Sequence, residues 1–172
     1  MRPLSAVARD GVATKLSVVL PASDRVVLLR PFEVADRRVI IQGRDEESDR
    51  WLGPGSPEPS PTACIEVGGL VVGWIDADPS PAWLQPGEAN IGYSVFPAHR
   101  GNGYATRALR LLAAELDVPG VNRALLVIDV DNHASIRVAR AAGARVLTSR
   151  RLSPFPTSIV YSLALTPRAG PD

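Results

Sequence analysis

A regular spacing of apolar residues predicts a helix in the second half of the chain. Between Gly101 and Leu116 the apolar residues recur three or four positions apart, at 105, 108, 109, 112, 113 and 116. This spacing places them on one face of a helix, whereas a strand would scatter them over both faces. Residues 134–142 are rich in alanine and precede Gly143, a residue suited to the position just after a helix. They predict a second, shorter helix.

Short runs of apolar and β-branched residues predict the strands. They occupy residues 25–30, 63–67, 70–75, 90–96, 123–130, 145–151 and 158–165. Gly68 and Gly69 separate the second run from the third, and two glycines suit the tight turn of a β-hairpin. Residues 33–52 predict helix with Gly43 as a candidate break, and the proline-rich residues 53–61 predict a loop. Hairpins followed by alternating strands and helices indicate an α/β domain with helices on both faces of its sheet.

Composition narrows the class of protein. The chain has 172 residues, 45% of them hydrophobic, and 19 basic against 18 acidic residues give a net charge of +1. We expect one folded domain over 25–166, a loosely packed N-terminal arm over 1–24 and a C-terminal tail over 167–172. No apolar run is long enough to span a membrane, and the balanced charge gives no general attraction for nucleic acid or a membrane. A single cysteine, Cys64, and the lack of a signal-peptide core predict a cytoplasmic protein.

The turn at the start of the helix predicted over 101–116 carries the candidate chemistry. Gly101 and Gly103 let backbone N–H groups point outward together, and a helix N-terminus adds unpaired donors and a positive dipole end. This arrangement suits a phosphate or diphosphate, to which Arg100, Arg107 and Arg110 are candidate contacts. The plain alternative is a glycine-rich turn with exposed arginines. Neither a dinucleotide fingerprint nor a Walker loop fits, because the third glycine and the lysine are missing.

Two sequence motifs, within residues 100–105 and 132–143, resemble motifs of the GNAT superfamily of N-acetyltransferases. Residues 100–105 match its R/Q-x-x-G-x-G/A motif for acyl-CoA, and Asn132, Ser135 and Gly143 match its N-x-x-S/A…G signature. With Ile91, Gly92 and Tyr93 they resemble most the branch that includes the ribosomal-protein N-terminal acetyltransferases. The element order fits over about residues 25–165, and the specific motifs lie within 90–144.

The resemblance implies a fold, a cosubstrate and a reaction. The fold is a mixed, mostly antiparallel sheet of about six to seven strands, with a splay between the two central strands, 90–96 and 123–130. Acetyl-CoA would lie in this splay, and its acetyl group would pass to a primary amine on a protein N-terminus or a small molecule. A homodimer is compatible with the sequence. The residues implied for acetyl-CoA binding are Tyr93, Ser94, Val95, Arg100, Gly101, Asn102, Gly103, Tyr104, Ala105, Thr106, Asn132 and Ser135.

The general acid and base are less clearly marked. Many relatives carry a tyrosine where this chain has Ala139, so Ser135 is the candidate acid by resemblance to the ribosomal branch. Its alternative role is a helix cap. Glu88 and Asp129 are the candidate bases, and either is equally compatible with a solvated charge at the end of a strand. A catalytically degenerate acyl-CoA-binding module is therefore the alternative to an enzyme.

The other polar and aromatic residues have plainer interpretations. His99 and His133 have no companions at ligand spacing, so we expect no metal site. Cys64 is expected to be a small buried hydrophobic residue. Among the tryptophans, Trp83 is the candidate for the edge of the acceptor cleft. The acidic residues 45–49 are expected to form a solvated face.

Overall fold

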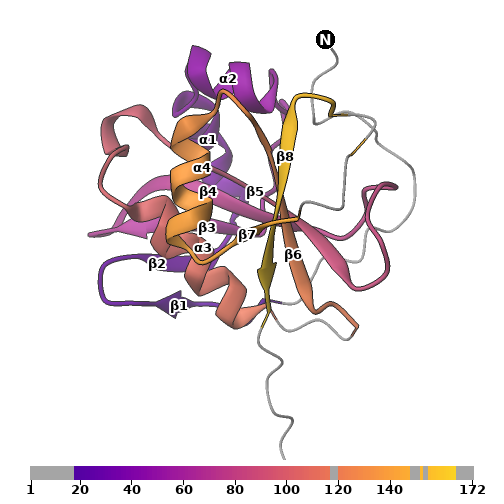
Figure 1. Ribbon diagram of the computed structural model, residues 1–172. Helices are drawn as coiled ribbons and strands as arrows, with labels where there is room; N and C mark the ends of the chain where they lie inside the picture. Colours follow the sequence, from indigo (N-terminus) through magenta and orange to yellow (C-terminus); the bar gives the residue numbers. More distant parts are fainter. Residues whose placement is uncertain (1–17, 117–119, 148–151, 153–154, 166–172) are drawn as a thin grey trace, which may run out of the picture.

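In the computed structural model, which describes residues 18–116, 120–147, 152 and 155–165, eight strands form one sheet (Figure 1). Their order in the sheet is β1-β2-β3-β4-β5-β6-β8-β7. All neighbours are antiparallel except β5 and β6, which are parallel. The strands are β1 (Ala22–Ser23), β2 (Leu28–Pro31), β3 (Ala63–Val67), β4 (Leu70–Asp78), β5 (Glu88–Val95), β6 (Arg123–Asp129), β7 (Arg145–Val146) and β8 (Ser158–Ala164). The predicted mixed sheet is confirmed, with the two-residue strand β1 added at one edge.

The two central strands separate after a short parallel contact. Residues 88–90 of β5 pair with residues 123–125 of β6, and the pairing ends there. Both strands run on, to Val95 and Asp129. Past Asn90 the edge of β5 that faces β6 therefore lacks a strand partner, although its other edge stays paired with β4 as far as Val95. This is the splay that the resemblance implied.

Helices cover both faces of the sheet. They are the 3₁₀ turn η1 (Val34–Asp36), α1 (Arg37–Gln42), α2 (Glu46–Leu52), the 3₁₀ turn η2 (Pro97–His99), α3 (Tyr104–Glu115) and α4 (His133–Ala141). Neighbouring strand residues point to opposite faces. Ile65 accordingly packs in the main core with Leu109 and Leu112 of α3, whereas Cys64 packs with Ile40 of α1. Cys64 is fully buried, as expected.

The helical segment after β2 is broken at Gly43, and a second helix follows the break. Asp45 caps that helix, α2, because its side chain accepts a hydrogen bond from the backbone N–H of Ser48 at 2.9 Å. The Gly68–Gly69 hairpin between β3 and β4 is confirmed, with φ angles of +57° and +80°. The predicted strand over 145–151 is shorter within the described residues, since β7 ends at Val146 and residues 148–151 lie outside them.

The described part of the predicted N-terminal arm is packed against the domain. Ala22 is buried and β1 pairs with β2, so the expected boundary at residue 24 falls inside a hairpin. The N–H of Val19 also donates to the carbonyl of Glu115 at 3.1 Å. The expectation of a loose arm is therefore wrong for residues 18–24, because their apolar side chains complete the core below α3. Residues 1–17 and 167–172 lie outside the described residues.

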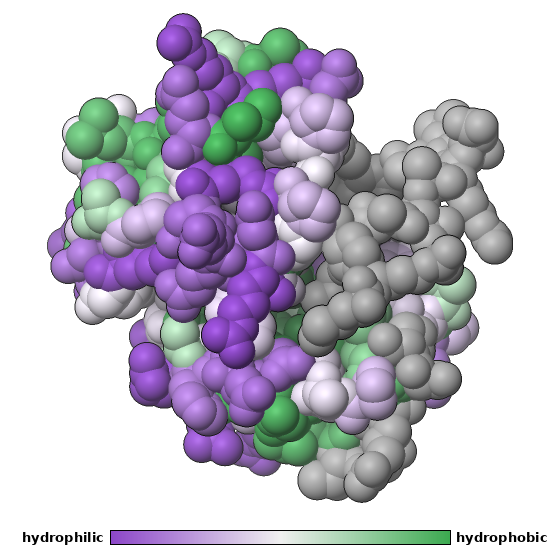
Figure 2. Space-filling view, turned by 90° about the horizontal axis from the view of Figure 1, so that it is seen from above, coloured by the Kyte–Doolittle hydropathy of each residue, from purple (hydrophilic) through white to green (hydrophobic). Residues whose placement is uncertain are grey.

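The surface seen from the α2 side is mainly hydrophilic, with separate hydrophobic patches (Figure 2). Such a mixture is usual, because folded domains have too little polar surface to cover themselves completely. Within the described ranges, no helix has the length and hydropathy needed to cross a membrane.

Candidate active site

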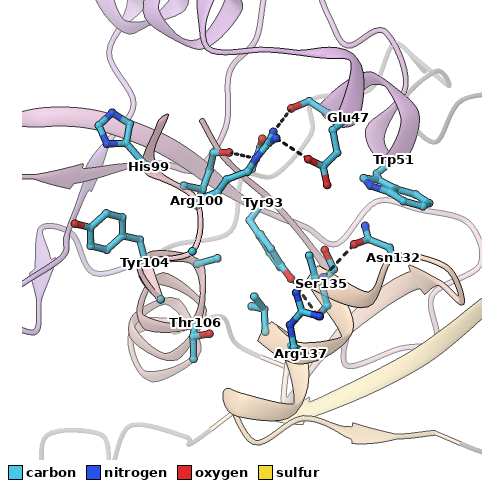
Figure 3. A pocket seen from close by; sticks show the side chains of 18 of the residues that line it. Glu47, Trp51, Tyr93, His99, Arg100, Tyr104, Thr106, Asn132, Ser135 and Arg137 are labelled. Carbon is cyan, nitrogen blue, oxygen red and sulfur yellow. Dashed lines mark hydrogen bonds and ion pairs between the residues drawn. The ribbon is translucent and has the colours of Figure 1, made fainter. Parts of the chain in front are cut away.

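A pocket of about 330 Å³ opens where β5 and β6 separate (Figure 3). Its walls come from α2, the end of β5, the turn leading into α3, and α4. All the residues predicted to bind the cosubstrate line it except Asn102: Tyr93, Ser94, Val95, Arg100, Gly101, Gly103, Tyr104, Ala105, Thr106, Asn132 and Ser135. Two motifs that lie some thirty residues apart in the chain thus meet in one cavity.

The N-terminus of α3 presents backbone donors to this pocket. Gly103 is the N-cap residue with φ +77°, and no side chain caps the helix. The first helical hydrogen bond runs from the N–H of Arg107 to the carbonyl of Gly103 at 3.1 Å. The N–H groups of Tyr104, Ala105 and Thr106 precede it and have no acceptor within the helix. Together with the helix dipole they form a site suited to a phosphate group.

Gly101 and Asn102 shape the turn before that helix. Gly101 has φ +80°, a conformation that other residues rarely adopt, and an added Cβ would meet nothing within 4 Å. Asn102 does not line the pocket. Its side-chain amide donates to the carbonyls of His99 and Arg100 at 3.1 and 3.2 Å. The Asn102 side chain therefore holds the turn in shape.

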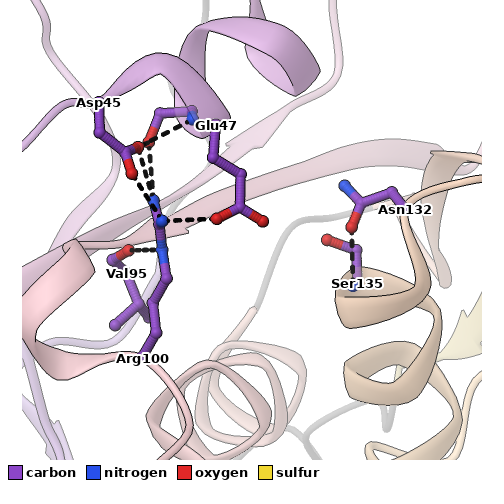
Figure 4. Close-up of polar contacts among 7 residues, drawn as sticks. Asp45, Glu47, Val95, Arg100, Asn132 and Ser135 are labelled. Atoms are coloured by element: carbon purple, nitrogen blue, oxygen red, sulfur yellow. Dashed lines mark hydrogen bonds and ion pairs between the residues drawn. The ribbon is translucent and has the colours of Figure 1, made fainter.

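Arg100 is engaged by α2 (Figure 4). Its guanidinium donates to both carboxylate oxygens of Asp45 at 2.7 and 2.8 Å, and to Glu47 at 2.7 Å. Its Nε donates to the carbonyl of Val95 at 3.0 Å. The hydrogen bonds from Arg100 hold the pKa of Asp45 well below its usual range, and Asp45 in turn raises the pKa of Arg100. The predicted solvated face over 45–49 is confirmed for Glu46, Glu47 and Asp49, which are exposed, whereas Asp45 is half-buried against Arg100. Asp45 and Glu47 together neutralise Arg100.

The other cations predicted for the anion are also engaged. Arg107 forms an ion pair with Asp24 at 2.7 Å, and Arg110 donates to the carbonyl of Ala141. Arg137 of α4 lines the pocket instead, and within the described ranges it forms no ion pair. Sequence reasoning missed Arg137 because it lies outside the glycine turn. The signal was its place two residues after Ser135, on the first turns of a helix already placed at the site.

Asn132, Ser135 and Tyr93 form a contact across the pocket. The Asn132 side chain caps α4 by accepting a hydrogen bond from the N–H of Ser135 at 3.0 Å. The Tyr93 hydroxyl donates to the carbonyl of Ser135 at 3.5 Å. Burial raises the pKa of Tyr93 to about 12, so this hydroxyl stays protonated near neutral pH. Two hydroxyl-bearing residues, one from β5 and one from α4, thus stand together at the open part of the splay.

The two predicted bases lie elsewhere. Glu88 sits at the closed end of the splay, where it accepts from the N–H of Gln85 at 2.9 Å and lies 3.8 Å from Arg123. It lies five positions before Tyr93 along β5, a distance of about 17 Å. Asp129 accepts from the N–H of Asp131 and the hydroxyl of Thr157, at 3.0 and 2.8 Å. Neither carboxylate lines the pocket, because each is held by a turn next to its own strand end.

The tryptophan that lines the pocket is Trp51 of α2. The predicted residue, Trp83, packs edge to face on Phe155 with ring centroids 5.8 Å apart, within a cluster on β6 and β8. Its loop folds over that cluster and away from the pocket. Within the described ranges, no group of three or more His, Cys, Asp or Glu side chains is arranged to hold a metal ion.

Comparison with known proteins connects this geometry to a family. Residues 61–145 match the family model for the acetyltransferase (GNAT) domain, which spans β3 to the start of β7. No curated protein matches the chain.

Solved structures of acetyltransferases share the architecture. An acetyltransferase from Agrobacterium tumefaciens is 20% identical, with a TM-score of 0.65, over 91% of this chain and 99% of that one. The aminoglycoside acetyltransferase AAC(6')-Ib in complex with coenzyme A is 16% identical, with a TM-score of 0.67, over 80% and 94%. Mycobacterium smegmatis RimJ in complex with CoA-disulfide is 20% identical, with a TM-score of 0.60, over 88% and 86%. The chain therefore has the GNAT acetyltransferase fold, and residues 61–145, just under half of its length, match the acetyltransferase (GNAT) domain itself.

Proposed function

We propose that this protein is an N-acetyltransferase that transfers the acetyl group of acetyl-CoA directly to a primary amine. The observation that carries the proposal is the uncapped N-terminus of α3, which opens into the same pocket as the unpaired edge of β5. The first supplies donors for a diphosphate, and the second supplies a strand edge for an extended, amide-containing arm. The match to the acetyltransferase (GNAT) domain supports this use of the pocket.

The residues of the pocket fit acetyl-CoA in separate parts. The backbone N–H groups of residues 101–106 would hold the diphosphate, and Arg137 would add a positive charge nearby. The backbone of Tyr93 and Ser94 would bond the arm. The carbonyl of Val95 already accepts a hydrogen bond from Arg100, so Val95 is less available to bond the arm. Arg100 then acts by holding α2 against the turn, through Asp45 and Glu47.

The chemistry requires one bond exchange and two proton movements. The amine nitrogen forms a bond to the acetyl carbon, the carbon–sulfur bond breaks, the nitrogen loses a proton and the sulfur gains one. Ser135 lines the pocket and is the candidate donor of the proton to sulfur. Tyr93 bonds the Ser135 carbonyl and so steadies the first turn of α4. Neither Glu88 nor Asp129 borders the pocket, so the amine must lose its proton elsewhere, to water or to another carboxylate.

The proposal is tested by measuring binding and turnover separately. Calorimetry with acetyl-CoA should show binding at one site per chain. Release of free coenzyme A should then depend on an added primary amine. Absence of binding would contradict the proposed function altogether. Tight binding without release over a broad panel of amines and peptides would favour the alternative, a binding module that lacks turnover.

A further inference from the structure

Glu47 of α2 is the one carboxylate among the described residues that line the pocket. The other titratable or charged side chains there are those of Tyr93, His99, Arg100, Tyr104 and Arg137. The anion-binding turn does not account for Glu47, because a negative charge repels a diphosphate. Figures 3 and 4 show the Glu47 carboxylate extending from α2 toward Asn132 and Ser135, where the candidate proton donor lies.

One negative charge is left over where α2 contacts Arg100. Asp45 and Glu47 both form ion pairs with this single guanidinium. Both oxygens of Asp45 are used, because Oδ2 accepts from Arg100 and Oδ1 accepts from Arg100 and from the N–H and hydroxyl of Ser48, at 2.7 to 2.9 Å. Glu47 accepts from Arg100 through Oε2, at 2.7 Å. Within the described ranges its other oxygen, Oε1, accepts no hydrogen bond, so the excess charge faces the pocket at this atom.

The contact with Arg100 also fixes the direction of the Glu47 carboxylate. The guanidinium of Arg100 is itself held by the carbonyl of Val95 at 3.0 Å and by the hydroxyl of Ser48 at 3.1 Å. A carboxylate held through one oxygen presents the other in a defined direction, as proton transfer requires. The Glu47 side chain is 52% exposed, so it exchanges protons readily with water.

The other titratable groups of the pocket are less suited to take a proton from an amine. Burial raises the pKa of Tyr93 to about 12, so its hydroxyl is a proton donor near neutral pH. The two arginines are permanent cations. His99 and Tyr104 lie away from Ser135, at the end of the pocket that the anion-binding turn forms (Figure 3).

A second cavity, of about 230 Å³, adjoins the pocket on the other face of the sheet and holds a further carboxylate, Asp76 of β4. The two cavities meet at α2 and at Ser94, but Asp76 does not line the pocket. Its Oδ1 accepts hydrogen bonds from the N–H and the hydroxyl of Thr62, at 2.9 and 2.8 Å. Of the carboxylates among the described lining residues, Glu47 is thus the one that borders the proposed acetyl-CoA site.

We propose that Glu47 is the general base of the reaction and that its Oε1 takes protons from the nitrogen of the acceptor. The inference rests on the proposed function. An entering ammonium ion gives one proton to Glu47, which passes it to water, and the neutral nitrogen then bonds the acetyl carbon as the carbon–sulfur bond breaks. Glu47, again deprotonated, takes a second proton from nitrogen as the amide forms. Sulfur gains its proton from Ser135, which recovers one from water, so the reaction yields the amide, coenzyme A and one proton.

A glutamine substitution tests the proton transfer. Glu47→Gln keeps an oxygen that accepts a hydrogen bond from Arg100 and removes the base. Methylamine, 2-phenylethylamine, spermidine and triglycine serve as acceptors, and kcat for the fastest of them should fall about a hundredfold near neutral pH. The control is Glu46→Gln, which should keep its kcat, because Glu46 is also exposed in the first turn of α2 but does not line the pocket. Equal kcat in the two variants would overturn the inference.

The pH dependence separates a base from a residue that only supports the structure. Between about pH 7 and about pH 10 free amine and hydroxide become abundant and replace the missing base. The deficit in kcat of Glu47→Gln should therefore shrink to about tenfold or less. A deficit that stays the same at every pH, or a higher KM with unchanged kcat, would contradict the role of Glu47 as a base.

Acetyl-CoA binding separates failure of this inference from failure of the proposed function. Glu47→Gln should bind acetyl-CoA at least as tightly as the unaltered protein, because it removes a negative charge from the pocket, and this binding also shows that the variant is folded. If the unaltered protein does not bind acetyl-CoA, or releases no coenzyme A with any of the four amines, the proposed function fails. If it releases coenzyme A and Glu47→Gln does so equally fast, only the assignment of Glu47 fails.

Discussion

The two cavities are built in different ways. The anion-binding part of the first is the backbone of one turn, residues 101–106, and its donors are N–H groups that a helix start always leaves unpaired. The second, a cavity of about 230 Å³ on the other face of the sheet, takes its walls from α1, α2, the following loop, β4 and β5, which are far apart in the sequence. A backbone site belongs to a local motif and survives many side-chain changes. A site walled by distant segments depends on how those segments pack, so a substitution in any of them can change it.

The α1–α2 side is also held by ion pairs, whereas the anion site has no titratable group of its own among the N–H donors. Arg30 joins Asp36 at 2.7 Å and Glu66 at 2.9 Å, and Arg100 joins Asp45 and Glu47. We therefore expect changes of charge or of pH to alter the stability of the protein mainly through the α1–α2 side.

The largest effect is expected from a carboxylate placed in the anion site. Gly103→Glu should weaken acetyl-CoA binding about a hundredfold or more in calorimetry, because like charges in contact cost several kcal/mol. Gly68→Glu is the matched control: Gly68 also has positive φ and open space around it, but lies in the β3–β4 hairpin. Both variants should lose about 1 kcal/mol of stability from backbone strain. Equal acetyl-CoA affinity in the two would break the comparison.

Ser135→Ala should lower kcat about a hundredfold and leave acetyl-CoA affinity nearly unchanged, if Ser135 supplies the proton to sulfur. Tyr93→Phe removes the neighbouring hydroxyl, which bonds only the Ser135 carbonyl among the described residues, and should have a smaller effect on kcat. Steady-state kinetics with calorimetry on both variants provides the measurement. The same kcat in Ser135→Ala and the unaltered protein would remove Ser135 from that role.

Replacing each of two arginines by methionine, in separate variants, should separate an effect on acetyl-CoA binding from an effect on stability. Arg137→Met should weaken acetyl-CoA binding about tenfold, more at low salt, because an exposed charge acts through a screened field. Arg100→Met should instead lower the free energy of unfolding by about 1 kcal/mol or more, since it leaves Asp45 and Glu47 without their cation. The opposite assignment of the two effects, seen by calorimetry and denaturant unfolding, would show that Arg100 binds the anion.

The smallest effect is expected from acid. Hydrogen bonds from Arg30 lower the pKa of Asp36 from 3.8 to about 2, and the pKa of Asp45 is lowered in the same direction by Arg100. A carboxyl whose pKa is lower in the folded state adds stability above its unfolded pKa and loses it as the pH falls toward its folded pKa. The free energy of unfolding should therefore fall between pH 3.8 and about 2, and less steeply in Asp36→Asn. Parallel curves for the two proteins would contradict this.

Local patterns were enough for most of the fold. The period of apolar residues located α3, the glycine pair located the β3–β4 hairpin, and Gly43 marked the break between α1 and α2. The ends of the strands were predicted less accurately. For example, β5 begins two residues before its apolar run, at Glu88, which is buried against the turn at Gln85. The hairpin of β1 was missed because two residues leave no periodic signal, and only pairing with β2 makes them a strand.

The same distinction holds for the site: its short-range features were predicted, and its long-range contacts were not. The glycine turn and the Asn132–Ser135 cap were visible because each works through neighbours within about four residues. The partners of Arg100 were not visible, because Asp45 lies 55 positions away and only folding brings α2 against the turn. Glu88 and Asp129 were plausible bases by residue type and strand position. Their surroundings, which no local pattern gives, bind each side chain to the turn next to its own strand end.

The chain by itself determined where backbone donors gather and which elements carry them, because φ preferences and helix ends are properties of neighbouring residues. Tertiary structure decided which charges are already neutralised, that Trp51 and Arg137 face the splay, and that a carboxylate on β4 lies in an apolar cavity behind it. Those outcomes depend on side chains from segments far apart in sequence. Their contacts exist only once the sheet and its covering helices have closed around them.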